Sequence, residues 1–323
     1  MHLVARASFL VLMTASCAAV DAPGESLGVA SVAASVSDPS EVPDEARLLL
    51  TVPATEARRQ ARGTSAPVLP ITYHGGPVIP MTKVAAIYWG DLPIFAGGPT
   101  PGTTGPGSAD TSVVGDFLKN LGGSPYWLIN SDYTDQSGRR VGTPITYTQF
   151  WAATPAPNPI VNDKAVRAQI TAGLVSGQLT YDRQTVYLVF SGPGVNLGAG
   201  FGTAYCAYHY FFFWGTKSVV YAVLPWAQQY PGVCTRLQGS PNNDFGADAL
   251  ATPIAHEVEE AATDPGITSW YDVNKDENAD KCAWTFGSTY PSPNGALANM
   301  QLGNRHYLVQ QNWKLPVQGC AMS

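Results

Sequence analysis

The sequence predicts a single α+β domain with a mixed sheet and a β-hairpin. Short apolar runs have the length of buried strands, and between them lie segments whose apolar residues recur with helical spacing. Two further apolar runs flank the turn Gly215-Thr216-Lys217, which is typical of a hairpin. Helices that lie between strands, together with a hairpin, indicate one α+β domain.

Each element is predicted from its local pattern. Strands are expected at Val84–Trp89, Thr185–Phe190 and Tyr307–Trp313, and the hairpin strands at Ala204–Trp214 and Ser218–Leu224. Helices are expected at Ser108–Leu121, Asn162–Leu179 and Phe245–Thr263. The first of these helices has its apolar residues on one stripe and ends at Gly122-Gly123.

The composition argues against two classes of protein. Only 13% of the 323 residues are charged, 11% are aromatic, and the formal net charge is −6. A disordered polyelectrolyte carries more charge and fewer aromatic residues. A nucleic-acid-binding protein needs a basic face, so we expect no nucleic-acid partner. No apolar run reaches the ~20 residues of a membrane span.

The N-terminus predicts export. Ala7–Ser16 is apolar and has the length of a secretory core segment, so residues 1–17 are a signal peptide or a lipoprotein signal. Thr14-Ala15-Ser16-Cys17 resembles a lipoprotein box with Cys17 as the lipidated residue, whereas cleavage near Ala18 or Ala19 would remove Cys17. We expect an extracellular protein or an outer-membrane or periplasmic lipoprotein, with membrane contact only through a lipid at Cys17.

Residues 18–66 are predicted to be a disordered linker or a propeptide, and residues 67–323 the folded domain. The first segment has no aromatic residue and cannot bury enough apolar surface to offset its chain entropy. Arg58-Arg59 or Arg62 would be the processing site of a propeptide, and Glu45–Arg59 is a short helix in either case. The domain has four cysteines (Cys206, Cys234, Cys282 and Cys320), and an even number in an exported chain predicts two disulfides.

The segment His256-Glu257-Val258-Glu259-Glu260 is the strongest chemical signal. On a helix, His256 and Glu260 are one turn apart and emerge on one face. This resembles the HExxH helix of zincins with the second His replaced by Glu. It predicts a zincin-like helix with His256 and Glu260 as ligands of a zinc ion and Glu257 as the catalytic base. The alternative is a solvated acidic helix face, but small apolar neighbours favour a buried helix.

A third metal ligand must come from elsewhere in the chain. Glu277 is the first choice, with Asp280 as its supporting residue, and His209 and Asp280 are the reserves. His74, next to Gly75-Gly76, is a candidate for the mouth of the site. The alternatives are a turn with an incidental histidine for His74 and a core histidine for His209.

Several segments in order resemble the phosphate-induced protein 1 / EXORDIUM family. They include YHGGPV at 73–78, SDYTDQSG at 131–138, CAYHYFFF at 206–213, YPGVC at 230–234, IAHEVEEAATDPGITSWYD at 254–272, ENADKC at 277–282 and HYLVQQNW at 306–313. The resemblance implies a secreted protein, linked in plants to growth and extracellular signalling, without an established catalytic activity.

At two places the chain departs from the family pattern, and each departure predicts a structural difference. The family has a second cysteine four residues before each of Cys206 and Cys234, where this chain has Gly202 and Tyr230. Their joint absence implies the loss of one disulfide and leaves Cys206–Cys234 and Cys282–Cys320. The family prefers an aliphatic residue where this chain has Pro253, so the helix either starts near Pro253 or bends there.

These observations support three functional hypotheses, of which the third is a cell-wall carbohydrate binder, suggested by the 34 aromatic residues and the plant relatives of the family. The first is an exported metal-dependent hydrolase that acts on peptide bonds of an extracellular peptide or protein. The second is a non-catalytic extracellular or cell-wall binding or signalling protein with a structural or vestigial metal site. Its partner would be a cell-wall component.

Overall fold

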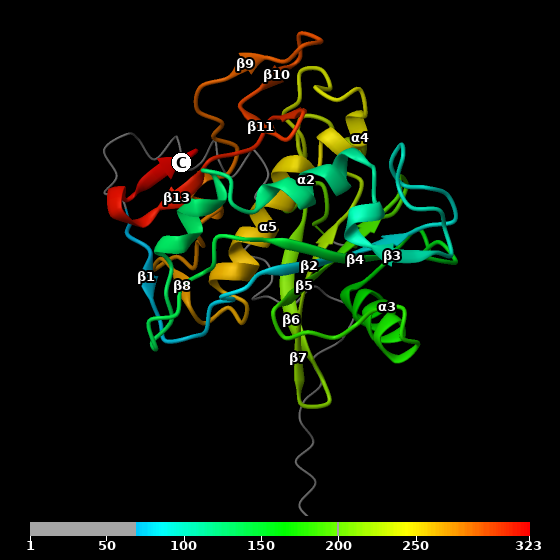
Figure 1. The fold of residues 1–323 in the computed structure, drawn as a ribbon, viewed down its shortest axis with the longest axis horizontal. Helices are drawn as coiled ribbons and strands as arrows, with labels where there is room; N and C mark the ends of the chain where they lie inside the picture. The colour runs from blue at the N-terminus through cyan, green and yellow to red at the C-terminus, as the bar shows by residue number, and fades with distance from the viewer. Residues whose placement is uncertain (1–68, 199) are drawn as a thin grey trace, which may run out of the picture. The chain divides into compact units, whose positions relative to one another are not determined.

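A six-stranded mixed sheet forms the centre of the protein (Figure 1). The computed structural model describes residues 69–198 and 200–323. The strand order is β3-β4-β2-β5-β7-β6, in which the four inner strands are parallel and the two edge strands antiparallel. The strands are β2 (Lys83–Trp89), β3 (Thr104–Pro106), β4 (Thr146–Ala153), β5 (Thr185–Ser191), β6 (Tyr208–Trp214) and β7 (Lys217–Leu224). The α+β class, the mixed sheet and the β6–β7 hairpin are thereby confirmed.

Helices cover both faces of the sheet. Helices α2 (Val113–Leu121) and α5 (Ala251–Thr263) share a core with Val84 and Ala86 of β2. Helix α3 (Asp163–Val175) shares the second core with Ala85 and Ile87. Because successive side chains of a strand point to opposite faces, the buried part of β2 must be apolar on both, and after Lys83 its sequence is a continuous apolar run.

The three predicted helices exist with shorter bounds. Helix α2 begins after a 3₁₀ turn, η2 (Gly107–Ala109), and its N-cap Ser112 accepts a hydrogen bond from the Gly115 amide. The segment predicted as one helix, Phe245–Thr263, forms two helices, α4 (Phe245–Asp248) and α5. Pro253 lies in the first turn of α5, where a backbone N–H has no partner within the helix. The helix therefore starts near Pro253.

The predicted strand at 307–313 is wrong. The chain forms β12 (Arg305–Tyr307) and β13 (Asn312–Lys314), with irregular backbone between them. The side chain of Asn299 bonds both the amide and the carbonyl of Val309, and the Gln311 amide donates to the Thr285 carbonyl. Side-chain and loop partners thus replace a strand ladder. Strand β4 was not predicted, because its polar residues interrupt the apolar run.

The remaining elements are short. Two-stranded pairs are β1 (Thr72–Tyr73) with β8 (Trp270–Tyr271), β9 (Tyr290–Pro291) with β10 (Leu297–Ala298), β11 (Met300–Leu302) with β12, and β13 with β14 (Gly319–Ala321). Further 3₁₀ turns are η3 (Trp127–Asp132), η4 (Ala227–Gln229), η5 (Asp280–Cys282) and η6 (Leu315–Val317). Among the described residues no helix is long and apolar enough to cross a bilayer. The predictions for residues 1–66 lie outside the described residues.

Both predicted disulfides are present. Cys206 bonds to Cys234 and Cys282 bonds to Cys320. The ring of Tyr230 lies over Gly202, since a Cβ atom added to Gly202 would come within 2.5 Å of that ring. The two positions that depart from the family pattern are therefore neighbours in space, as the loss of one disulfide between them implies.

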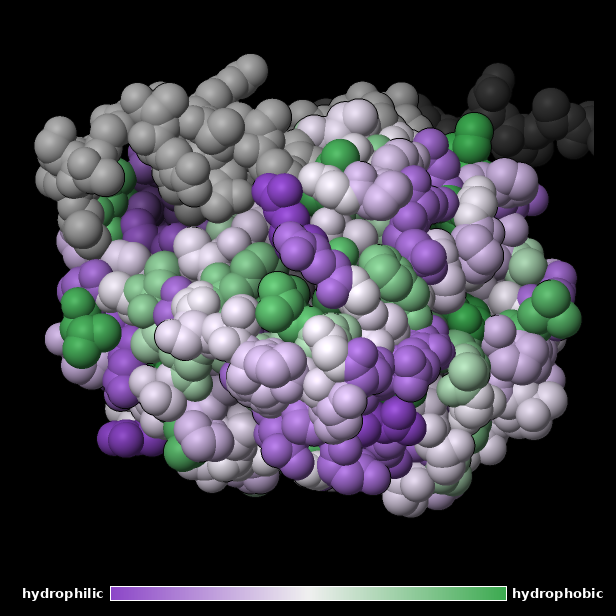
Figure 2. Space-filling model, turned by 90° about the horizontal axis from the view of Figure 1, so that it is seen from above, coloured by the Kyte–Doolittle hydropathy of each residue, from purple (hydrophilic) through white to green (hydrophobic). Residues whose placement is uncertain are grey.

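Hydrophobic side chains are dispersed on the face that Figure 2 shows. Green residues lie in small groups between white and purple ones, and they form no continuous apolar surface there. Large apolar patches mark association surfaces. Among the described residues, this face therefore has no apolar patch of the kind that marks an association surface.

Candidate metal centre

A cluster of two histidines and four carboxylates lies where α5 packs against β6 at the edge of the sheet. His209 comes from β6, which contacts α5, and His256, Glu257 and Glu260 come from α5 itself. Asp280 is the first residue of η5, and Glu277 lies three residues before it. Each of the six residues is 2% exposed or less. Small residues on α5, including Ala255, Ala261 and Ala262, allow this close packing.

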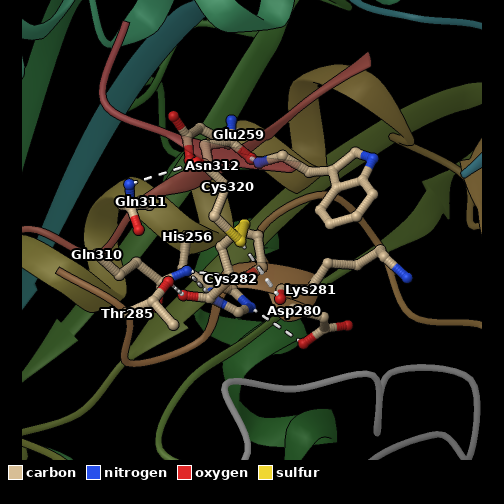
Figure 3. The surroundings of a disulfide bond; sticks show 12 residues. His256, Glu259, Asp280, Lys281, Cys282, Thr285, Gln310, Gln311, Asn312 and Cys320 are labelled. Atoms are coloured by element: carbon tan, nitrogen blue, oxygen red, sulfur yellow. Dashed lines mark hydrogen bonds and ion pairs between the residues drawn. A yellow bond between two sulfur atoms is a disulfide. The ribbon is translucent and has the colours of Figure 1, made fainter. Parts of the chain in front are cut away.

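The first half of the cluster surrounds His256. Its Nε2 atom lies 3.1 Å from Oε1 of Glu260 and 3.4 Å from Oδ1 of Asp280. The Asp280 amide donates to Glu260 Oε1 at 3.0 Å. The side-chain amide of Gln310 contacts His256 Nδ1 at 3.1 Å and donates to the Ala279 carbonyl at 2.9 Å. Gln310 therefore fixes the ring with Nε2 toward the carboxylates (Figure 3).

The second half surrounds His209. Its Nδ1 atom lies 3.4 Å from Oε2 of Glu257 and 3.5 Å from Oε2 of Glu260. Its Nε2 atom lies 3.8 Å from Oε2 of Glu277. Glu260 thus has one carboxylate oxygen in each half, and it joins the two halves into one centre.

The predicted site residues are grouped differently in the structure than the sequence indicates. Asp280, rather than Glu277, lies beside His256 and Glu260, and Glu277 faces His209. Glu257 lies in the donor set of His209, next to Glu260. His74 is not brought to this cluster: its exposed ring stacks on Tyr271, with a centroid distance of 3.8 Å.

Several nitrogen and oxygen atoms of the centre that could bind a metal have no hydrogen-bond partner within the described residues. They are both ring nitrogens of His209, both carboxylate oxygens of Glu257 and both of Glu277. A buried polar atom without a partner costs about 1–3 kcal/mol, and such atoms are rare in native proteins. A cation bound among these grouped atoms would satisfy them.

The pKa values of the cluster reflect its burial and its own ion pairs. Burial alone would lower the pKa of His209, but Glu277, Glu257 and Glu260 outweigh it and raise that pKa well above its usual value. For Glu257 and Glu277 burial is the largest influence, and it raises the pKa of both carboxyl groups. No Lys or Arg of the described residues forms an ion pair with either glutamate. His209 is the ion-pair partner of both glutamates.

The donor set fits a divalent cation. Ligands ~2.0–2.2 Å from one tetrahedral zinc ion lie ~3.3–3.6 Å apart. The distances from the histidine nitrogens to Glu257, Glu260 and Asp280 are 3.1 to 3.5 Å. In each of two three-residue groups, one ligand atom from each residue lies within 4.8 Å of the others: His209, Glu257 and Glu260, and His256, Glu260 and Asp280. Mixed histidine and carboxylate ligands are those of many zinc sites.

Glu259 is buried on the same helix but belongs to a different network. Its carboxylate accepts hydrogen bonds from the Tyr126 hydroxyl at 3.0 Å and from the Asn130 amide at 3.4 Å. Burial raises the pKa of Glu259 to about 8. Glu259 is therefore a matched control for Glu260, with the same residue type, burial and helix.

Each disulfide braces one side of the centre. Cys206 precedes His209 by three residues, and Cys282 follows Asp280 by two on η5. Figure 3 shows His256, Gln310 and Asp280 grouped beside the Cys282–Cys320 bond. Gln310 was not foreseen from the sequence. Its only signal is a polar pair, Gln310-Gln311, within an apolar segment.

Fold and centre together define a disulfide-bonded α+β protein, of the kind found in oxidising compartments, with a buried histidine–carboxylate centre. The chain belongs to the phosphate-induced protein 1 family, since that family's conserved region matches residues 109–322. Protein EXORDIUM-like 3 of Arabidopsis thaliana is 26% identical over 65% of this chain and 71% of its own length. Protein EXORDIUM-like 5 of the same plant is 26% identical over 65% and 69%. No solved structure gave a significant match.

Proposed function

We propose that this protein is an exported, non-catalytic binding protein whose buried centre holds a divalent cation as a structural element. The observation that carries the proposal is the burial of the whole donor set. All six side chains are 2% exposed or less. Structural metal sites are closed by protein ligands, whereas catalytic sites keep a position open to solvent and substrate.

The position of the centre suits a structural role. A cation there would bind residues from β6, α5 and the segment 277–280, three parts of the chain that are distant in sequence. It would neutralise carboxylates that repel one another and satisfy the donor atoms that lack partners. Binding to the folded state alone stabilises the fold by mass action. Zinc is the first choice, because the donors combine histidine nitrogens with carboxylate oxygens.

A hydrolase is the second candidate, and one observation favours it. Both carboxylate oxygens of Glu257 lack a hydrogen-bond partner, and they lie next to the other donors of the centre. A bound metal would supply Lewis-acid polarisation, and Glu257 would accept a proton at its free carboxylate. The burial of the centre makes this candidate weaker than the structural one.

Thermal unfolding of the purified exported protein tests the proposal. A strong chelator should lower the unfolding temperature, and added zinc should restore it. Wild type and Glu257→Gln should both lack activity in a broad peptide-hydrolysis screen. If the wild type cleaves a peptide and Glu257→Gln does not, the hydrolase is correct instead. If chelation leaves the unfolding temperature unchanged in both proteins, the structural cation is excluded.

A further inference from the structure

A second candidate site lies at the carboxyl ends of the parallel strands. A cavity of about 600 Å³ is lined by residues at or after the ends of four strands. They are Trp89 to Ile94 at the end of β2, Ala156, Pro157 and Pro159 after β4, Gly192 to Val195 after β5, and Trp226 after β7. Its size is within the range of about 300–1,000 Å³ that is usual for small-molecule sites. It shares no lining residue with the histidine–carboxylate centre.

The topology places this cavity where a ligand site is expected. The chain leaves β2 toward α2, which packs in the core on one face of the sheet. It leaves the neighbouring strand β5 toward Val195 and Leu197, which pack in the core on the other face. Adjacent parallel strands whose connections diverge in this way open a crevice outside their carboxyl ends, and open α/β sheets bind ligands there.

Two indole rings form rigid walls of the cavity. The Trp226 ring stacks on Phe95, with a centroid distance of 5.8 Å, and a Cβ atom on Gly246 would come within 1.9 Å of it. The indole N–H of Trp89 donates to the Pro155 carbonyl at 2.9 Å. Both side chains are half-buried, so each is held in place yet reaches the cavity. Aromatic walls held in this way bind a ligand at little entropic cost.

The polar groups of the cavity select an uncharged ligand. The lining contains no Lys, Arg or His, and its one charged side chain is Asp91. Asp91 Oδ1 accepts from the Ala156 amide at 2.8 Å, and the indole N–H of Trp226 makes no hydrogen bond within the described residues. The cavity thus offers flat apolar faces, a carboxylate acceptor and an indole donor. Such a set does not suit phosphates or other anions.

We propose that this cavity binds a neutral oligosaccharide. The apolar C–H faces of a sugar ring would lie against Trp89 and Trp226, and its hydroxyl groups would bond to Asp91 and to the Trp226 N–H. The inference goes beyond the proposed function, because it assigns a ligand class to a different site. Its test needs no metal analysis, so either proposal can fail while the other stands.

Isothermal titration of the exported protein tests this assignment. The probes are cellohexaose and chitohexaose as neutral saccharides, an oligogalacturonate as an acidic one, and a proline-rich peptide as the other ligand that aromatic grooves accept. We expect a neutral saccharide to bind and the oligogalacturonate and the peptide not to bind. Trp89→Ala and Trp226→Ala should each weaken binding by at least about tenfold.

Control variants keep the test decisive. Trp214→Ala, at the β6–β7 turn outside the cavity, should leave binding unchanged. Because Trp226→Ala could unfold the packing around Phe95, Asp91→Ala at an exposed position should still weaken binding several-fold. The assignment is overturned if neither neutral saccharide binds, if the peptide alone binds, or if the acidic saccharide binds more strongly. It is also overturned if Asp91→Ala and Trp89→Ala bind the saccharide as well as the wild type does.

Discussion

His256 Nε2 lies 3.1 Å from Oε1 of Glu260, one helical turn further along α5. Both side chains are fully buried, so the charges of this ion pair attract each other in a low-dielectric site. This contact is the relationship that the His-x-x-x-Glu spacing predicts. It anchors the half of the centre that also contains Asp280.

Glu260→Gln should destabilise the protein by about 3–5 kcal/mol, because removal of one partner leaves uncompensated groups in the interior. Glu259→Gln should cost about 1 kcal/mol or less, since a glutamine resembles the protonated carboxyl that a pKa of about 8 implies at neutral pH. Urea unfolding of both variants measures the difference. Equal losses of unfolding free energy in the two variants would mean that the ion pairs of Glu260 with His209 and His256 do not stabilise the fold.

The part of this centre that is local in sequence could be predicted, and the part that depends on tertiary contacts could not. Helical periodicity places His256 and Glu260 on one face whatever the fold. The grouping of Asp280 with that pair, and of Glu277 with His209, depends on how η5 and β6 meet α5. Pairwise spacing along the chain does not contain that information.

The fold shows the same division. Continuous apolar runs identified β2 and β5, because the central residues of strands buried on both faces are apolar. Strand β4 carries polar residues at several positions and was missed. The segment around Val309 has the composition of a strand, but the side chain of Asn299 takes its backbone partners.

The turn around Asp135 should loosen in acid. Hydrogen bonds from Ser137, together with the Arg139 side chain and amide, outweigh partial burial and lower the pKa of Asp135 to about 2. A carboxyl group whose folded pKa is lowered contributes stability above its unfolded pKa, near 4, and loses it as the pH falls toward 2. The Ser137 and Arg139 amide signals in NMR should therefore titrate with a midpoint near 2. Asp135→Asn should abolish the titration, and a midpoint near 4 would contradict the assignment.

The disulfides should contribute substantially to stability. The residues of Cys282–Cys320 are 38 apart in sequence and those of Cys206–Cys234 are 28 apart. Loop-closure entropy for such separations corresponds to about 3–4 kcal/mol for each bond. Unfolding of the Cys282→Ser/Cys320→Ser double variant in urea should show a loss of this size. A loss below about 1 kcal/mol would mean that the disulfide restricts the unfolded chain little.

Gly246 should not tolerate a side chain. A Cβ atom there would lie 1.9 Å from the Trp226 ring, so Gly246→Ala must displace that indole. We expect a loss of about 1–3 kcal/mol, as for other overpacked sites. Gly192→Ala is the matched control, because its added Cβ would meet nothing within 4 Å. Thermal unfolding of both variants tests the prediction, and an unaffected Gly246→Ala protein would contradict the packing described for Trp226.

Elemental mass spectrometry of the purified exported protein measures whether the buried centre holds a metal. We expect close to one divalent cation per wild-type chain, an equal content in Glu259→Gln, and loss of the metal in Glu260→Gln, whose carboxylate joins both halves of the centre. A wild-type protein without bound metal, or a Glu260→Gln protein with the full content, would contradict this expectation.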